Sequence, residues 1–261
     1  MKKSIFTGIL VLAAGVSGLM AQGAPAAAPA AAPAAPHQPT PKSQAELQAI
    51  QAMFAAQNNP DAVIKAADDL LTKFADTEFK ELAYFMEAEA YQQKKDLTKA
   101  QVIAEQAMAM NPKSYQAAIM LAELITQQTR EGDLDREDKL TKAANYANSA
   151  IENVKDVAKP NPQVTDEQWV EFKKGIVARA HNAIGLGNLT RKKYDVAATE
   201  FKQAADEDPQ PAYLVREASA LQSGGKNAEA LAICDKLLAD PNLHPAIKQV
   251  ATQIKTLASK K

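Results

Sequence analysis

The sequence predicts an all-α solenoid of about five stacked helical hairpins that ends in a single capping helix. One observation is a small residue that recurs at intervals of 34, 43, 54 and 33 residues, at Ala66, Ala100, Ala143, Ala197 and Ala230. Two intervals match the period of a helix–turn–helix repeat, and the other two exceed it by 9 and 20 residues, as insertions would. The other observation is composition: hydrophobic residues make up 46% and aromatic residues only 5%, which is typical of alanine-rich, closely packed helices.

Residues 1–23 are expected to be a secretory signal peptide. Lys2 and Lys3 supply a positive start, and the apolar stretch 5–20 is shorter than the ~20 residues that a membrane-spanning helix needs. Small residues follow, so we expect cleavage after Ala21 or Gly23. The alternative is that this segment stays on the protein and anchors it in a membrane.

Residues 24–42 are expected to be an Ala/Pro-rich disordered linker, because frequent proline blocks helix and favours an extended polyproline II conformation. The folded solenoid domain is expected to cover residues 43–261. Ser43 is a plausible N-cap for its first helix, and Glu46 lies at the third position that completes a capping box.

The segment 81–114 carries the clearest repeat pattern. It has an aromatic residue, a small residue and another aromatic residue at Tyr84, Ala88 and Tyr91, followed by Ala100 in the second helix and Pro112 at its end. Small residues let two antiparallel helices approach closely, aromatic residues fill the space beside them, and proline ends the second helix. In this pattern the segment resembles a tetratricopeptide repeat.

The resemblance implies a right-handed solenoid over most of the chain. The second-best unit, 178–211, has Gly185 at the first small position and Ala197 and Phe201 in its second helix. The nine-residue insertion falls around 129–139, a long helix is expected over 165–187, and residues 244–259 read as the capping helix. Terminal helices with one polar face are expected of solenoids.

No pattern in the sequence points to catalysis. The net charge of -1 argues against a nucleic-acid surface, which needs a basic excess. His37, His181 and His244 are scattered rather than clustered as metal ligands would be, and Cys234 lies at an inward-facing helix position. We therefore expect no enzyme activity, no cofactor and no metal site.

The resemblance implies that the first helices of successive units line a concave groove that binds a protein or peptide. The groove positions that it implies are Leu82, Phe85, Glu89, Gln92, Gln116, Ile119, Glu123, Arg179, Asn182 and Leu186. Leu82 and Phe85 are expected to be exposed apolar anchors. Alternatively, the protein's own long helix fills the groove, since Trp169 and Phe172 near its start must pack somewhere.

These patterns favour a non-enzymatic protein–protein interaction module or scaffold of the bacterial cell envelope, periplasmic or secreted. The alternative is a membrane-anchored assembly factor that keeps its amino-terminal segment. The expected partner is another protein or peptide and not a nucleic acid, and contact with a membrane is expected only through the amino-terminal segment.

Overall fold

The computed structural model describes residues 39–260, so the expected signal peptide and all but the last four residues of the expected linker lie outside it. The described residues form eleven α-helices and no strand. The helices are α1 (Gln44–Ala55), α2 (Pro60–Lys73), α3 (Lys80–Gln93), α4 (Leu97–Met110), α5 (Tyr115–Gln128), α6 (Arg136–Lys155), α7 (Asp166–Thr190), α8 (Tyr194–Glu207), α9 (Pro211–Ser223), α10 (Asn227–Leu238) and α11 (Pro245–Ala258).

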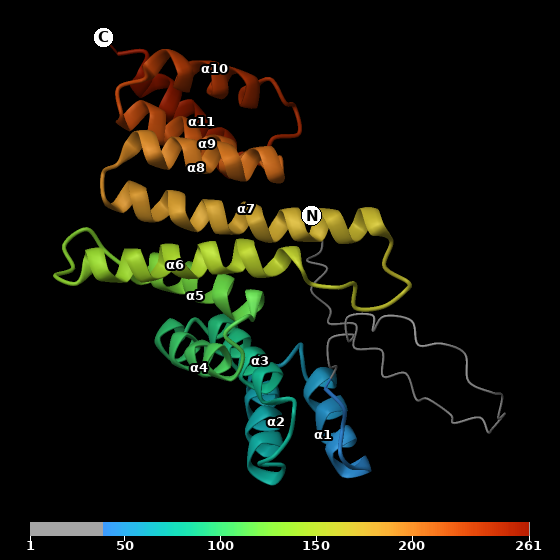
Figure 1. Cartoon of the computed structure of the whole chain (residues 1–261). Coiled ribbons are helices and arrows are strands. Elements are labelled where there is room, and N and C mark those ends of the chain that lie inside the picture. Colours follow the sequence, from blue (N-terminus) through green and yellow to red (C-terminus); the bar gives the residue numbers. More distant parts are fainter. Residues whose placement is uncertain (1–38, 261) are drawn as a thin grey trace, which may run out of the picture.

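The helices stack in chain order, each packing on the next, from α1 at one end to α10 and α11 at the other (Figure 1). They form five hairpins, α1–α2 to α9–α10, and α11 packs on both helices of the last hairpin. The first helices α5 and α7 also touch directly, because they lie on the same side of the stack. The predicted all-α hairpin array with a capping helix is confirmed.

A common register of buried residues joins the five second helices. Each buries three residues at positions i, i+4 and i+7, which lie on one helix face. These triplets are Val63, Ala67 and Leu70; Ala100, Ala104 and Ala107; Ala143, Ala147 and Ala150; Ala197, Phe201 and Ala204; and Ala230, Cys234 and Leu237.

The register confirms four of the five predicted alanines and corrects the first. Val63, rather than Ala66, occupies the position equivalent to Ala100, and Ala66 is only partly buried. The second helix of the first hairpin therefore has Val63 where the later second helices have alanine. The larger side chain is one reason why α1–α2 matches the repeat pattern least.

Gly185 lies where α7 and α8 of the fourth hairpin cross. A Cβ atom built at Gly185 would lie 2.7 Å from a ring carbon of Phe201, which is completely buried. The other later units pair alanine with a small residue at the equivalent crossing, for example Ala88 with Ala104 in α3 and α4. Only glycine leaves room for the Phe201 ring at this crossing.

The chain enters the array through an entry clasp, formed by Thr40, Lys42 and Glu46 against residues 76–78. The buried Glu46 carboxylate accepts hydrogen bonds from the Lys42 backbone N–H at 2.6 Å and the Thr77 hydroxyl at 2.5 Å. The Thr40 N–H donates to Glu78, and the Lys42 ammonium pairs with Asp76, both at 2.9 Å. Ser43 does cap α1, since its hydroxyl accepts from the Glu46 N–H, but Glu46 bonds to Lys42 and Thr77 instead of closing the predicted capping box.

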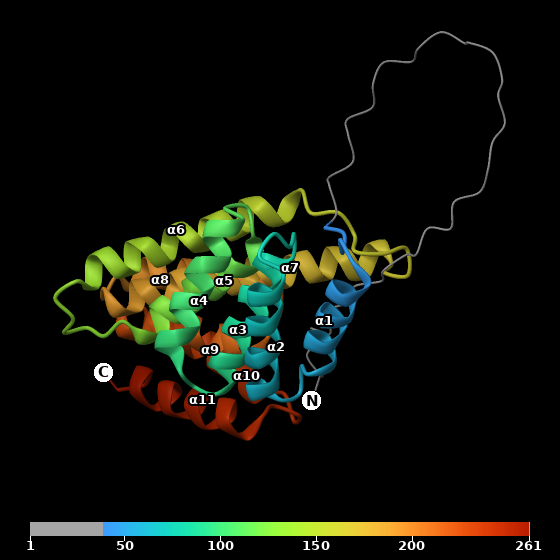
Figure 2. The same ribbon diagram turned by 90° about the horizontal axis from the view of Figure 1, so that it is seen from below.

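The two predicted insertions lengthen the middle hairpins. The first is divided between the 129–135 loop and an extra turn at the start of α6. The second forms the 156–165 loop and the first part of α7, which extends past α8 in both views (Figures 1 and 2). Trp169 stacks on Phe172 at 4.8 Å and donates its indole N–H to the Val157 carbonyl, while Phe172 packs edge-on against Tyr115. These aromatic contacts fix the α7 extension to α5 and the 156–165 loop.

Three hairpin loops use the same backbone turn with different residues. Lys95, Lys192 and Gly225 have φ values of 62°, 59° and 82°, in the left-handed region that favours glycine. In each loop the next residue donates its backbone N–H back to the last turn of the preceding helix, as Asp96 does to Tyr91 and Lys193 does to Asn188. Two lysines therefore occupy positions where a glycine would fit without strain.

Replacing Lys95 with glycine should raise the free energy of unfolding by about 0.5–1 kcal/mol, because the left-handed conformation costs lysine roughly 1–2 kcal/mol. Urea titration followed by circular dichroism measures the change. The matched control is Gly225→Ala in the equivalent loop, which should destabilise the protein because it places a Cβ in the same conformation. A destabilised Lys95→Gly variant would contradict this account of the loops.

Candidate functional site

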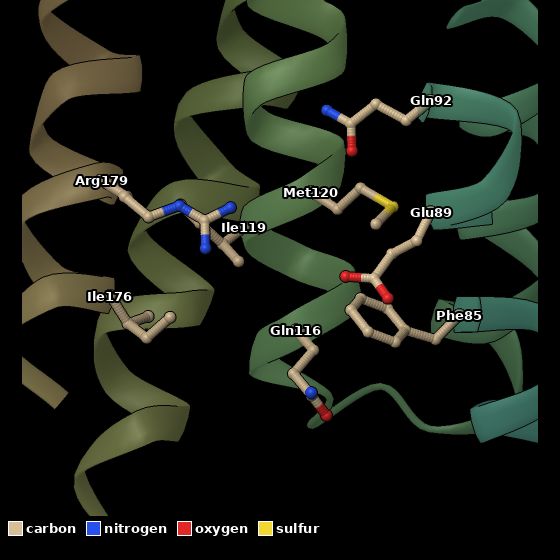
Figure 3. Close-up of a pocket in the computed structure, with 8 residues that line it drawn as sticks. All are labelled: Phe85, Glu89, Gln92, Gln116, Ile119, Met120, Ile176 and Arg179. Atoms are coloured by element: carbon tan, nitrogen blue, oxygen red, sulfur yellow. The ribbon is translucent and has the colours of Figure 1, made fainter. Parts of the chain in front are cut away.

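A hollow of about 390 Å³ lies against the first helices of three successive hairpins. Its walls come from α3, α5 and α7 (Figure 3). The residues that line it are Phe85, Glu89 and Gln92 from α3, Gln116, Ile119 and Met120 from α5, and Ile176 and Arg179 from α7. Three helices that are not consecutive in the sequence thus form one site, because stacking of the hairpins places the first helix of each beside the first helix of the next.

Helical spacing explains which side chains enter the hollow. Phe85, Glu89 and Gln92 lie at i, i+4 and i+7, so they form one stripe along α3. Gln116 and Ile119 face them from α5, three residues apart. Six of the ten predicted groove residues therefore surround this hollow: Phe85, Glu89, Gln92, Gln116, Ile119 and Arg179.

The hollow has an apolar floor and polar sides. Phe85 is 7% exposed and Ile119 and Ile176 are each 2% exposed, whereas Glu89, Gln92, Gln116 and Arg179 are partly exposed. The expectation that Phe85 is an exposed anchor is therefore wrong, and Leu82 is only partly exposed. Phe85 packs into the core between α3, α4 and α5, and Leu82 packs against the core of the first three helices.

Arg179 is held by Glu123 across the α5–α7 contact. Its guanidinium donates from Nε to one carboxylate oxygen at 2.8 Å and from a terminal nitrogen to the other at 2.6 Å. Such a two-point pair between arginine and a carboxylate is stronger and more directional than a single hydrogen bond. The pair fixes Arg179 at the edge of the hollow and neutralises its charge there.

Glu89 has no such partner. Its carboxylate makes no hydrogen bond or ion pair with any residue in 39–260. Burial raises the pKa of Glu89 to about 7, and the positive charge of Arg179 opposes this shift only in part. In Figure 3 the Glu89 and Arg179 side chains extend toward one another from facing walls. Near neutral pH the Glu89 carboxyl thus lies in the hollow partly ionised and without a hydrogen-bond partner.

Glu87 offers a comparison on the same helix. Burial also raises the pKa of Glu87 to about 7, with a further contribution from the negative charge of Asp68 on α2. Residues two apart on a helix do not share a face. Glu87 therefore turns toward α2 and away from the hollow, and it provides a matched control for every experiment on Glu89.

The remaining predicted groove residues lie outside the hollow. Glu123 supports Arg179 from behind, and Leu186 packs against the core of the last hairpins. Asn182 is buried and accepts a hydrogen bond from Arg216 of α9 at 2.6 Å, so it joins α7 to α9.

Sequence reasoning missed Met120 and Ile176. Met120 directly follows a predicted position, and Ile176 lies one turn before Arg179, ahead of the repeat pattern in its helix. The long α7 forms a wall of the hollow and does not fill it, which decides against the alternative in which this helix occupies the groove.

Cys234 and His181 also carry reactive side chains, and both are held inside the fold or paired. Cys234 is fully buried, as its helix position predicts, and burial raises the pKa of its thiol. His181 lies 2.8 Å from a carboxylate oxygen of Glu200. Within residues 39–260 no group of three or more His, Cys, Asp or Glu side chains is placed to hold a metal ion. None of the eleven described helices is long and apolar enough to cross a membrane.

No family model and no curated protein matches this chain, but solved structures do align with it. A crystal structure of a thermophilic TPR protein from Thermus thermophilus aligns at 18% identity with a TM-score of 0.52, over 81% of this chain and 97% of the other. A structure described as the MamA RS-1 ArsTM double mutant aligns at 8% identity with a TM-score of 0.54, over 84% and 99% of the two chains. At these identities the likeness shows the fold alone: the chain has the fold of tetratricopeptide repeat proteins, which confirms the resemblance seen in its sequence.

Proposed function

We propose that this protein is a non-enzymatic interaction module that holds a segment of another protein in the hollow between α3, α5 and α7. The observation that carries the proposal is the lining of the hollow. Three rigid helices present polar groups without partners, the Glu89 carboxyl and the Gln92 and Gln116 amides, above a closely packed apolar floor. Polar groups on a rigid scaffold, with apolar surface beneath them, are typical of binding sites.

We also propose that the module acts in the bacterial cell envelope after export. The positive start and apolar stretch of residues 1–23 support export, and the Ala/Pro-rich segment 24–42 supports a role as a spacer. The alternative is a membrane-anchored assembly factor with an uncleaved amino-terminal segment. Mass spectrometry of the protein from cells separates the two, because export with cleavage removes about the first 21–23 residues.

Site-specific photo-crosslinking tests the proposed function. A benzoylphenylalanine at position 116, inside the hollow, should crosslink in cells to a defined partner protein. The purified protein should then bind that partner saturably, with one partner molecule per hollow. The matched control is the same residue at Val102, which is 52% exposed on α4, a second helix outside the hollow. Equal crosslinking from both positions, or none from position 116, would contradict binding in the hollow.

A further inference from the structure

We propose that the hollow binds an extended segment of its partner by pairing a lysine or arginine side chain with Glu89, next to an apolar side chain of the same segment. The proposal deepens the function inferred above and rests on it, because it names the chemistry of the bound segment. It is carried by the charges that line the hollow, by the contacts that already occupy Arg179, and by the buried apolar floor.

The charge balance of the site favours a cation. The charged groups that line the hollow are Glu89 from α3 and Arg179 from α7. Glu123 of α5 lies behind Arg179, and Tyr213 of α9 lies close to this pair. Glu123 neutralises Arg179 in their two-point pair, so Arg179 compensates the charge of Glu89 only in part and the three groups together keep one negative charge. A buried or half-buried charge without a partner is unfavourable, and a cation of the ligand removes that cost.

The same contacts argue against an acidic segment. A carboxylate ligand needs a free cation, but the Nε and one terminal nitrogen of Arg179 already donate to Glu123. The other terminal nitrogen of Arg179 could still donate to such a ligand, but Glu123 already neutralises the guanidinium charge, so the attraction would be weak. The ligand carboxylate would also face Glu89, which would repel it.

The size and lining of the hollow fit an extended segment and not a folded surface. A volume of about 390 Å³ lies at the low end of the range of small-ligand sites, roughly 300–1,000 Å³, so it holds only one or two side chains. The aliphatic stem of a lysine or arginine can cover apolar surface while its charged end reaches a carboxylate. Met120 and Phe85 provide that surface beside Glu89 (Figure 3). The Gln92 and Gln116 amides remain to bind the backbone of the segment.

The test compares two blocked peptides that differ in one group, acetyl-Ala-Leu-Arg-Leu-Ala-amide and the same peptide with citrulline, which has nearly the shape of arginine but no charge. Binding to the full chain at pH 8 is measured by NMR titration. We expect the arginine peptide to bind at least about tenfold more tightly than the citrulline peptide, because only arginine carries a charge that pairs with the ionised Glu89 carboxylate.

Glu89→Gln should abolish this preference for arginine, whereas Glu87→Gln, the matched control outside the hollow, should leave it unchanged. Binding of the arginine peptide should also weaken from pH 8 to pH 6 in the unmodified protein but not in Glu89→Gln, because only the ionised carboxylate attracts the cation. Equal affinity for the two peptides, no binding of the arginine peptide, or an unchanged preference in Glu89→Gln would overturn the proposal.

The crosslinking experiment separates this proposal from the function on which it rests. If Glu89→Gln leaves the crosslink from position 116 unchanged, the hollow binds a partner but not through a basic side chain, and the present proposal fails alone. If position 116 never crosslinks, the proposed function itself fails.

Discussion

Replacing Gly185 with alanine should lower the free energy of unfolding by about 1–3 kcal/mol, the usual cost of adding a methyl group to a filled core. The new Cβ would lie 2.7 Å from the Phe201 ring, so the ring or the backbone must shift, and the ring is fully buried among core side chains. The hairpin α7–α8 would have to open slightly at its crossing. Urea unfolding followed by far-ultraviolet circular dichroism measures the loss.

The same helix provides the control. Gly175 also lies in α7, but a Cβ built there meets nothing within 4 Å. Gly175→Ala should therefore stabilise the protein by up to about 1 kcal/mol, through the higher helix propensity of alanine. If the two substitutions change stability in the same direction, the contact with Phe201 does not set the requirement for glycine at position 185.

A double substitution gives a second check on this crossing. Phe201→Ala alone should cost about 3–5 kcal/mol because it leaves a cavity. Gly185→Ala combined with Phe201→Ala reproduces the pair that this chain uses at Ala88 and Ala104, and the added methyl group fills part of the cavity. The combined loss should be smaller than the sum of the single losses by roughly 0.5–3 kcal/mol, and strict additivity would count against direct contact.

Glu87→Gln should stabilise the protein at pH 8 and have little effect at pH 4. Burial raises the pKa of Glu87 from 4.5 to about 7, so the folded state binds a proton more tightly than the unfolded state between these values. The unmodified protein therefore loses stability as pH rises through this range, and the loss is complete above about pH 7. Glutamine resembles the neutral acid and has no proton to lose.

The gain from Glu87→Gln at pH 8 should be about 1–3 kcal/mol, since each unit of pKa shift corresponds to about 1.4 kcal/mol. Glu89→Gln should show the same pH dependence with a smaller gain, because its side chain is more exposed and Arg179 partly compensates its charge. Urea midpoints at pH 4, 6 and 8 give the comparison.

Glu131 serves as the opposite case. A hydrogen bond from Lys192 lowers the pKa of Glu131, so Glu131→Gln should not stabilise the protein at pH 8. An equal effect of Glu87→Gln at pH 4 and pH 8 would mean that Glu87 does not titrate as its burial implies.

Much of the fold follows from local sequence patterns. Small residues at hairpin crossings, such as Ala88 and Ala100, and turn residues at helix ends are enough to predict the number and order of the hairpins. The same pattern places the first hairpin three residues out of register. Its second helix contains the pair Ala66–Ala67, and composition alone does not tell which small residue faces the core when Val63 takes the crossing.

The site could be predicted only in part, because the sequence pattern within one hairpin shows which helix face a residue lies on but not how closely the next hairpin packs against it. Helical spacing places Glu89, Gln92 and Gln116 on the inner face whatever the distance between neighbouring helices. The exposure of Phe85 and the contact between Asn182 and Arg216 depend on how closely the first helix of the next hairpin approaches. That approach is set by packing between units, which the pattern within one unit does not contain.

The entry clasp determines how a mechanical load would reach the solenoid. A pull on the chain at residue 39 first meets the Thr40–Glu78 and Lys42–Asp76 contacts and the bonds of Glu46 to Lys42 and Thr77. These connect the point of attachment to the turn between the first and second hairpins. Tension would therefore spread across two hairpins at once, so α1 would not peel from the end of the stack one turn at a time.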